Sequence, residues 1–353
     1  MKEPVYSRTQ LDLLLKTLKQ FKKVLILTHS NPDPDAIASA FALKYLISHL
    51  TSCKARVVYS GVIGRRENKA MIRELSLNMV QVDEIHWKAY DGLVLIDHQP
   101  GRRYYPWPEN RWPDIVIDHH PRRPLAKAVK FIDVRTEFGS SSSLVASYLL
   151  AANLPIPRWL SSALIYGITT DTQEFSRSRI ERDKKIYISL FENADHLKIY
   201  RFSHPLYHSD YLSEYWYALK SAYIYKDIVI SFMGLVTVPD GTAEVADNLI
   251  NMHGIRYAVA TGYFADTLYM SLRVRNVRRD AGKILRLIVG KKGSAGGHGF
   301  MAGAQIKEIS SFEEAEQLAQ NLHNKIIKLL HPDFLLEQAK PVLYRKDIRG
   351  VGQ

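Results

Sequence analysis

Short, wholly apolar runs alternate with helix-like segments in the first half of the chain, and this alternation constrains the fold most. Residues 24–28 (VLILT) form such a run, and residues 36–50 (AIASAFALKYLISHL) have the composition of a helix. A short strand without polar positions is typical of a parallel sheet that is buried on both faces. Strands that alternate with helices indicate a doubly wound sheet. We therefore predict an α/β fold with a mainly parallel sheet.

The same alternation continues toward residue 170. We expect further strands at 56–60, 92–97, 114–118 and 130–134, and helices at 11–21, 66–76, 140–154 and 159–170. A second, smaller α/β pattern begins near residue 221. It comprises expected strands at 228–232, 257–264 and 267–274, helices at 243–254, 282–290 and 311–330, and a glycine-rich turn at 293–303.

A length of 353 residues is about twice that of a typical domain, which favours two domains. We predict a catalytic domain at 1–195, a tyrosine-rich connector at 196–220, a second domain at 221–335 and a basic tail at 336–353. Because these domains are joined by a connector, we expect a substrate cleft between them that opens and closes. Enzymes with such clefts are often dimers, so a homodimer is one expected assembly.

Composition limits the class of protein. A hydrophobic share of 46% with 24% charged residues is ordinary for a globular protein. We find neither an apolar run of the roughly 20 residues needed to span a bilayer nor a signal-peptide pattern, so a soluble, cytoplasmic protein without a membrane partner is expected. The single cysteine, Cys53, excludes an internal disulfide and a cysteine-rich metal site. The net charge of +12 attracts polyanions such as nucleic acid, unless it reflects only a basic surface.

Acidic and imidazole side chains follow several of the predicted elements. They are His29, Asp33 and Asp35 after the first strand, Asp97 after a second, Asp118, His119 and His120 after a third, and Asp171 at the end of an apolar helix. Each could act alone as a cap or turn residue, and Asp33 or Asp35 could cap the helix that begins at Ala36. In an open parallel sheet, however, the carboxyl ends of strands face one crevice. So many like charges there would repel one another unless cations neutralise them, so we predict a metal centre.

The types of ligand indicate which metal and which chemistry. Carboxylates and imidazoles without thiolates suit Mn²⁺, Mg²⁺ or a similar divalent ion better than structural zinc. The ligands suffice for two ions, with one carboxylate bridging them. Two ions about 3.5–4 Å apart turn water into hydroxide and stabilise an in-line displacement at phosphorus. The residues therefore predict metal-assisted hydrolysis of a phosphoester or phosphoanhydride.

Four segments also resemble a known family. THSNPDPDAIAS, LVLIDH, VIDHHP and YGITTDTQEF resemble, in this order, the signature motifs of the DHH phosphoesterase superfamily, whose namesake triplet is here Asp118-His119-His120. SAGGHGFMAGA resembles the glycine–histidine motif of the DHHA1 domain. The resemblance extends over roughly residues 20 to 330. It is closest to the subgroup of bifunctional oligoribonucleases, which degrade very short RNAs and remove the 3′-phosphate of phosphoadenosine phosphate.

The resemblance implies a role for each matching residue. It places His29 and Asp33 on one ion, Asp35, His119 and Asp171 on the other, and Asp97 between the two. It implies that His120 faces the substrate phosphate and that Asp118 orients the imidazoles, so that Asp97, His120 and Asp118 form the catalytic set. Mn²⁺ is the expected ion of the pair, with Mg²⁺ or Co²⁺ as alternatives.

A basic segment precedes the glycine–histidine motif. It contains Arg273, Arg275, Arg278, Arg279, Lys283, Arg286, Lys291 and Lys292. Such a segment before closely spaced glycines suits an anionic ligand, although a surface helix with a flexible turn has the same pattern. The resemblance implies that Arg273, Gly296, Gly297 and His298 bind substrate. Ala295 departs from the family pattern, which usually has a glycine there, and this puts the details of substrate binding in question.

The function expected from all this is a manganese-dependent phosphoesterase that acts as an exonuclease on short oligoribonucleotides, with phosphoadenosine phosphate as a further substrate. Two alternatives remain open: a phosphodiesterase for linear or cyclic di-adenylate, and a non-catalytic regulator that binds nucleotides through the metal site. A processive single-strand DNA exonuclease is disfavoured because such relatives carry extra domains. A pyrophosphatase is disfavoured because its second domain usually lacks the Gly-Gly-His turn.

Overall fold

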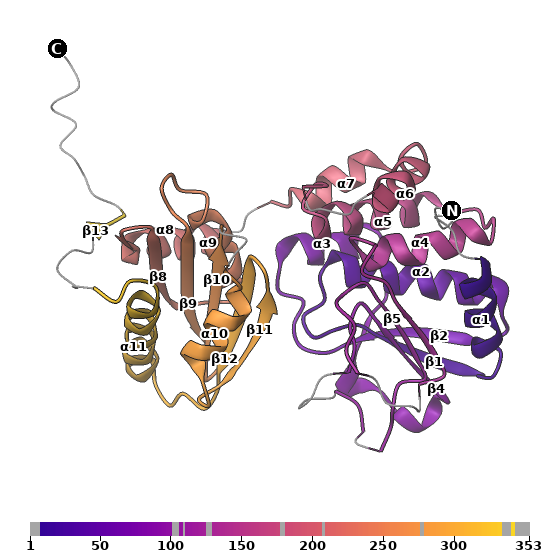
Figure 1. Ribbon diagram of the computed structural model, residues 1–353, viewed down its shortest axis with the longest axis horizontal. Coiled ribbons are helices and arrows are strands. Elements are labelled where there is room, and N and C mark those ends of the chain that lie inside the picture. Colours follow the sequence, from indigo (N-terminus) through magenta and orange to yellow (C-terminus); the bar gives the residue numbers. More distant parts are fainter. Residues whose placement is uncertain are drawn as a thin grey trace, which may run out of the picture. The chain divides into compact units, whose positions relative to one another are not determined.

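The chain divides into two compact units, Met1–Pro205 and Leu206–Gln353, in the computed structural model (Figure 1). Each unit has a sheet and a hydrophobic core of its own. The structure describes residues 8–100, 106–108, 110–124, 129–176, 181–206, 209–275, 279–333 and 340–342.

The first unit is built on a six-stranded parallel sheet. Its strands are β1 (Lys23–Leu27), β2 (Lys54–Tyr59), β3 (Val80–Gln81), β4 (Gly92–Ile96), β5 (Ile115–Asp118) and β6 (Phe131–Val134). They lie in the order β3-β2-β1-β4-β5-β6, and every neighbouring pair is parallel. The predicted parallel α/β sheet is thus confirmed. The strand order reverses between β1 and β4, which is where open sheets of this kind bind their ligands.

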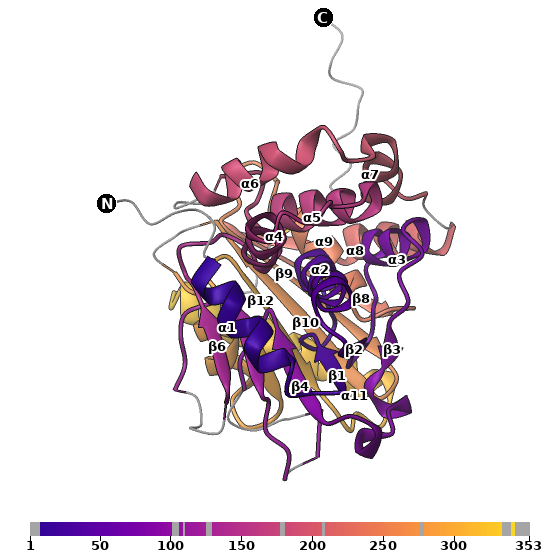
Figure 2. The ribbon, with the colours of Figure 1, turned by 90° about the vertical axis from the view of Figure 1, so that its right-hand side faces the viewer.

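Helices cover one face of this sheet. They are α1 (Arg8–Leu18), α2 (Pro34–Leu50), α3 (Arg66–Glu74), α4 (Ser141–Ala151), α5 (Arg158–Asp171), α6 (Glu181–Phe191) and α7 (His196–Ser203). Of these, α2, α4 and α5 lie together on one side of the strands (Figure 2). On the other face, the apolar side chains of the strands pack with the short 3-10 helix η1 (Val82–Glu84) and Trp107, with the 3-10 helix η2 (Trp87–Ala89) beside them.

Helix α2 connects the first strand to the candidate site. The side chain of Asp33 caps it by accepting a hydrogen bond from the backbone N–H of Ala36 (3.0 Å), and Pro34 occupies the first helical position. Both choices are favourable at a helix N-terminus. Most of α2 is buried because it lies between the sheet and α5, which explains why its apolar residues are not confined to one face.

The second unit has a mixed seven-stranded sheet. Its strands are β7 (Tyr223–Tyr225), β8 (Ile228–Leu235), β9 (Tyr257–Phe264), β10 (Thr267–Val274), β11 (Ser294–His298), β12 (Met301–Ile306) and β13 (Lys340–Pro341), in the order β11-β12-β10-β9-β8-β7-β13. Only the β8–β9 pair is parallel among these described strands. Helices α8 (Ser209–Ser221) and α9 (Gly241–Leu249) pack on one face, and α10 (Ala281–Val289) and α11 (Phe312–Leu330) on the other. This makes a three-layer α/β unit.

Three segments differ from the pattern drawn from the sequence. The predicted connector, 196–220, is largely helical: α7 packs against α3 and α5, whereas α8 packs against β8. The predicted glycine-rich turn at 293–303 is wrong, because these residues form the β11–β12 hairpin, in which Gly296 is paired with Gly303. Within the predicted basic tail, Lys340–Pro341 pairs with β7; apart from residues 340–342, the tail lies outside the described residues.

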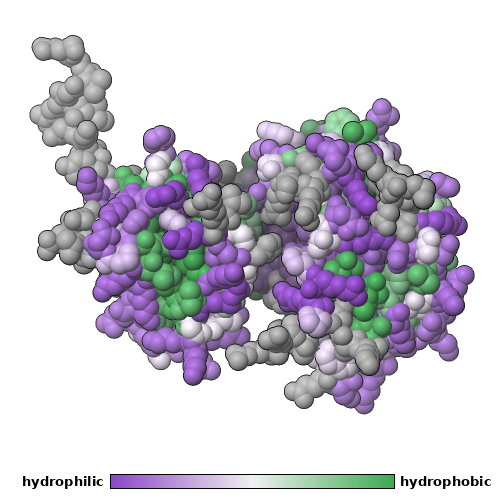
Figure 3. Space-filling view, viewed as in Figure 1, coloured by the Kyte–Doolittle hydropathy of each residue, from purple (hydrophilic) through white to green (hydrophobic). Residues whose placement is uncertain are grey.

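Hydrophilic side chains dominate the face of the molecule seen in Figure 3, with smaller apolar patches between them. Among the described helices we find none whose length and apolar character would let it cross a membrane.

Candidate metal centre

The predicted metal ligands come together at the carboxyl edge of the first sheet. Three overlapping groups each place their ligand atoms within 4.8 Å of one another: His29, Asp33 and Asp97; Asp35, His119 and Asp171; and Asp97, His119 and His120. The loops after β1, β4 and β5 supply most of them, Asp35 comes from the first turn of α2, and Asp171 is the last residue of α5. Side chains up to 142 positions apart in the chain thus face one another because parallel strands end at a common edge.

Asp97 connects the group that contains His29 and Asp33 with the group that contains His119. Its Oδ2 is 3.5 Å from Nε2 of His29, and its Oδ1 is 3.5 Å from Nε2 of His119. Its backbone φ of 61° is in the left-handed region, which is uncommon for residues other than glycine and marks a constrained position. One carboxylate therefore presents a separate oxygen to each group, as a bridging ligand would.

Each group is compact around its histidine. Nε2 of His119 lies 3.1 Å from Asp171 Oδ2 and 3.9 Å from Asp35 Oδ2. Nε2 of His29 lies 3.7 Å from Asp33 Oδ1, while Nδ1 of the same ring donates to the backbone carbonyl of Ser30 (2.9 Å). Because that hydrogen bond occupies Nδ1, Nε2 is the nitrogen that His29 offers to a ligand.

The electrostatics of the cluster favour added positive charge. Burial and the negative charges of Asp97 and Asp171 raise the pKa of Asp35 well above its usual value. Burial lowers the pKa of His119, but Asp171, Asp97 and Asp35 outweigh that effect and raise it to about 10. Burial also opposes the charged form of His29, yet Asp33 and Asp97 raise its pKa. The carboxylates therefore draw protons into the site, and cations would compete for the same place.

These residues fit a pair of divalent cations. Their donor atoms are carboxylate oxygens and imidazole nitrogens, a set that suits Mn²⁺ or Mg²⁺. Asp97 belongs to the group of His29 and Asp33 and lies 3.5 Å from His119 of the group of Asp35 and Asp171, so the two groups could hold two ions. The alternative role weighed for Asp33, that of a helix cap, is also observed, since its Oδ1 caps α2 while the same carboxylate belongs to the cluster. Capping and ligation are thus compatible at this residue.

Asp118 is held in the interior behind the cluster. It is fully buried, and its pKa is lowered to about 2: burial raises the pKa, but His120, Gln99 and His119 outweigh that effect. Nδ1 of His120 donates to its Oδ1 (2.9 Å), and the side-chain amide of Gln99 donates to its Oδ2 (2.6 Å). Asp118 thus orients His120 directly. Gln99 was not predicted, and its position two residues after Asp97 is the only sequence signal for it.

The serines at the start of α4 also contact the cluster, although they were not among the predicted site residues. Backbone N–H groups of Ser141 and Ser142 each donate to Asp35 (2.7 Å), and the hydroxyl of Ser141 donates to Asp97 (2.7 Å). The run of four serines at 140–143 was visible, and Ser140 is the N-cap of α4. Nothing in the sequence, however, indicates that this helix begins against the carboxylates.

The predicted substrate residues lie in the second unit. Arg273, in β10, is buried, and its guanidinium forms an ion pair with Asp247 and donates to the carbonyl of Leu272 (3.2 Å). A phosphate could reach this guanidinium only in competition with Asp247. Gly296 and Gly297 lie in β11, while the side chain of His298 is outside the described part of the chain.

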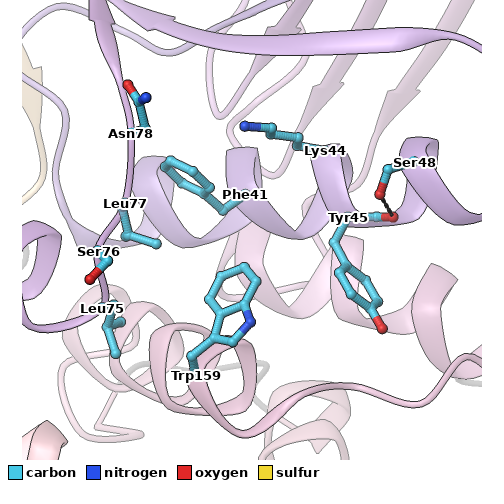
Figure 4. A pocket seen from close by; sticks show the side chains of 9 residues that line it. All are labelled: Phe41, Lys44, Tyr45, Ser48, Leu75, Ser76, Leu77, Asn78 and Trp159. Carbon is cyan, nitrogen blue, oxygen red and sulfur yellow. Dashed lines mark hydrogen bonds between the residues drawn. The ribbon is translucent and has the colours of Figure 1, made fainter.

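A separate cavity of about 390 Å³ opens in the first unit between α2, the start of α5 and the segment 75–78 (Figure 4). Phe41, Tyr45 and Trp159 line it, and Lys44 is the one charged side chain in its wall. Because this wall holds neither a carboxylate nor an imidazole, the cavity cannot replace the cluster as a metal site.

Comparison with known proteins agrees with this architecture. The model of the DHH family, N-terminal domain, matches residues 23–187, and that of the DHHA1 domain matches residues 225–328. A crystal structure of an exopolyphosphatase-related protein from Bacteroides fragilis has a TM-score of 0.70 at 18% identity, covering 94% of this chain and 99% of that one. That likeness supports the fold.

Three curated relatives share parts of the sequence. An uncharacterized protein of Methanocaldococcus jannaschii is 32% identical over 87% of this chain and 64% of its own length. A probable manganese-dependent inorganic pyrophosphatase of Lactococcus lactis is 27% identical over 42% of this chain and 48% of its own. A probable bifunctional oligoribonuclease and PAP phosphatase of Streptococcus mutans is 27% identical over 47% of this chain and 51% of its own. The chain therefore spans about half to two thirds of the length of these relatives.

Proposed function

Since residues 23–187 match the DHH family, N-terminal domain, and residues 225–328 match the DHHA1 domain, we propose that the chain is a two-metal phosphoesterase acting on short oligoribonucleotides. The observation that carries the proposal is the position of Asp97, whose two oxygens face two separate groups of ligands. Phosphoadenosine phosphate is proposed as a further substrate. The relative from Streptococcus mutans, named as both an oligoribonuclease and a PAP phosphatase, supports this choice.

The first unit holds the catalytic residues in this proposal. His29 and Asp33 would hold one cation, Asp35, His119 and Asp171 would hold the other, and Asp97 would be shared by both; the proximity of these side chains supports the assignment. Mn²⁺ is the proposed ion, which the relative named as a manganese-dependent pyrophosphatase supports. When bound, such a pair lowers the pKa of water and neutralises charge that develops on the phosphate oxygens.

His120 and Asp118 act on the substrate side. The ring of His120 is part of the group around Asp97, and its Nδ1 is fixed by Asp118. In this proposal Nε2 of His120 contacts a phosphate oxygen or donates a proton to the leaving group. Asp118, held by Gln99, keeps the ring in that orientation.

The second unit is proposed to bind the remainder of the substrate. Arg273, Gly296, Gly297 and His298 are the residues assigned to it. Basic side chains of the described segment 279–292, namely Arg279, Lys283, Arg286, Lys291 and Lys292, suit an anionic ligand of this kind.

One experiment tests the proposal directly. The purified chain is incubated with Mn²⁺ and, separately, with a ribodinucleotide, a five-nucleotide RNA, phosphoadenosine phosphate, and linear and cyclic di-adenylate. We expect turnover of the short RNAs, with the dinucleotide among the best substrates. Preferred turnover of a di-adenylate would replace the proposed substrate, and binding of nucleotides without any turnover would instead support a regulator.

A further inference from the structure

The N-terminus of α4 contacts two carboxylates of the candidate metal centre. The N–H of Ser141 donates to Oδ2 of Asp35 and the N–H of Ser142 to Oδ1, each at 2.7 Å. The hydroxyl of Ser141 donates to Oδ1 of Asp97 at 2.7 Å. All of these groups are buried, with Asp35 1% and Asp97 3% exposed. The first turn of α4 thus ties together two predicted ligands from different elements, Asp35 in α2 and Asp97 directly after β4.

These contacts matter because the carboxylates repel one another. A buried carboxylate needs hydrogen bonds to remain charged, and bonds from N–H and O–H donors to a charged oxygen are about twice as strong as neutral ones. The N-terminus of a helix also carries partial positive charge that favours nearby anions. Both carboxylate oxygens of Asp35 are used in this way, so its orientation is determined by α4.

The hydrogen bond from Ser141 also decides which way Asp97 points. It holds Oδ1 on the side of His119 (3.5 Å to Nε2), which leaves Oδ2 facing His29 (3.5 Å to Nε2). A rotation of this carboxylate would remove one oxygen from one of the two groups. We propose that Ser141 is a positioning residue whose hydroxyl keeps Asp97 in the bridging orientation between the two cations.

The start of α4 is itself firmly held. Asp183 in α6, which is fully buried, accepts a hydrogen bond from the N–H of Gly139 (2.8 Å). On the other side, α5 passes so closely that a Cβ on Gly167 would lie 2.4 Å from Oγ of Ser142 and 3.2 Å from Cα of Asp35. The serines therefore have little freedom to move away from the carboxylates, as a positioning element requires.

The inference rests on the proposed function, because it assumes that the cluster binds cations. It is tested with Ser141→Ala, which removes the hydroxyl and keeps the N–H that holds Asp35. Ser147→Ala is the matched control: Ser147 is also buried in α4, and its hydroxyl donates to the carbonyl of Leu144 (2.6 Å), away from the cluster. Binding of Mn²⁺ to the full chain is measured by isothermal titration calorimetry.

We expect Ser141→Ala to weaken the binding of at least one Mn²⁺ by about 10- to 100-fold, as is typical when a partner of a metal ligand is removed. Ser147→Ala should stay within about twofold of the parent chain, a difference far below that range. If the parent chain bound two Mn²⁺ and Ser141→Ala bound them as tightly as Ser147→Ala does, the positioning role would be overturned and the proposed function would remain intact. If the parent chain bound no Mn²⁺, the proposed function would fail, and the positioning role with it.

Circular dichroism would reveal a loss of folding in Ser141→Ala. Two further variants separate the effect of the hydroxyl from that of the side-chain shape. Ser141→Thr retains a hydroxyl and is expected to restore the affinity for Mn²⁺. Ser141→Cys keeps nearly the same shape but offers only a weak donor, so it should resemble Ser141→Ala. If Ser141→Cys bound Mn²⁺ as tightly as the parent chain, shape rather than hydrogen bonding would explain the contact, and the proposal would be wrong.

Discussion

The two sheets of this protein place their candidate functional residues differently. In the first unit all strands are parallel, so the loops after β1, β4 and β5 leave the sheet at one edge, and the ligand cluster lies there. In the second unit most neighbouring strands are antiparallel, and Arg273, Gly296 and Gly297 lie within strands. A parallel sheet collects residues from distant loops at one edge, whereas this mixed sheet presents its residues along the strands.

Charge follows the same division. The edge of the first sheet gathers four carboxylates whose repulsion calls for cations. The second unit instead has five basic side chains in the described segment 279–292, against the single acid Asp280. We therefore expect substitutions in the first unit to affect hydrolysis of every substrate, and substitutions in the second unit to affect only substrates large enough to contact it.

The largest effect is expected for Asp97→Asn. The variant keeps the shape of the side chain but loses the charge that both cations would share. Loss of metal-assisted catalysis, worth several kcal/mol, should reduce kcat/KM by about 1,000-fold or more. The fall should be alike for a ribodinucleotide and for the small ester bis-p-nitrophenyl phosphate, measured at steady state with Mn²⁺. If the variant kept more than about a tenth of the activity, the loss would be no larger than that caused by removing a single hydrogen bond. Asp97 would then not be the bridging residue.

Arg273→Ala should separate the two substrates. We expect KM for the dinucleotide to rise by about 10- to 100-fold, the value of one charge-assisted hydrogen bond, while cleavage of bis-p-nitrophenyl phosphate changes little. Because Asp247 forms an ion pair with this guanidinium, Asp247→Asn should release it and lower KM for the dinucleotide. Equal losses on both substrates for Arg273→Ala would contradict the division between the units.

Gly167→Ala tests how tightly the first unit is built around its ligands. The added methyl group would lie 2.4 Å from Oγ of Ser142, so Ser142 or α5 must shift. Overpacking of this kind costs about 1–3 kcal/mol of stability. We expect a lower free energy of unfolding in urea together with weaker binding of Mn²⁺. Gly254→Ala in the second unit, where no atom lies within 4 Å of the added carbon, is the control for crowding, although its φ of 79° adds backbone strain.

Much of this arrangement was predictable from the sequence because polar residues interrupt the apolar runs at the ends of the strands. Strands β9 and β10 were predicted with the observed bounds, and the ligand cluster followed from acids placed directly after buried strands. The strand β11 was missed because its glycines have low strand propensity, whereas its pairing with β12 uses only backbone groups. The contacts of Ser141 were missed because its partners Asp35 and Asp97 are 106 and 44 positions away, and no local pattern encodes such contacts.

A smaller effect is expected from His323 in the core of the second unit. Burial lowers its pKa to about 3, and the ring is within hydrogen-bond distance of the Thr261 hydroxyl (2.9 Å). The unfolded chain, with a histidine pKa near 6.5, binds a proton between these values that the folded chain does not. This contribution to stability is therefore complete above about pH 6.5 and is lost as pH falls toward 3, by up to about 1.4 kcal/mol per pH unit.

His323→Gln provides the comparison, since glutamine does not titrate. Urea unfolding of both chains at pH 7.5, 6 and 5 should show the free energy of unfolding of the parent falling more steeply than that of the variant. The histidines of the first unit are the same in both chains, so their effects cancel in the difference. Parallel pH dependences would show that residue 323 does not contribute.

The smallest change in stability is expected for Gly296→Ala, and it is the most direct test of whether β11 contacts substrate. A Cβ at Gly296 would meet no atom within 4 Å, so the free energy of unfolding should stay within about 0.5 kcal/mol of the parent value. At Gly297, by contrast, φ is 118° and a Cβ would lie 2.5 Å from Cα of Ala302, so Gly297→Ala should destabilise the hairpin. Stability therefore explains the glycine at 297 but not the one at 296. If Gly296→Ala raises KM for the dinucleotide without changing the midpoint of thermal unfolding, the missing side chain makes room for a ligand; if KM is unchanged, the anionic substrate binds elsewhere on the second unit.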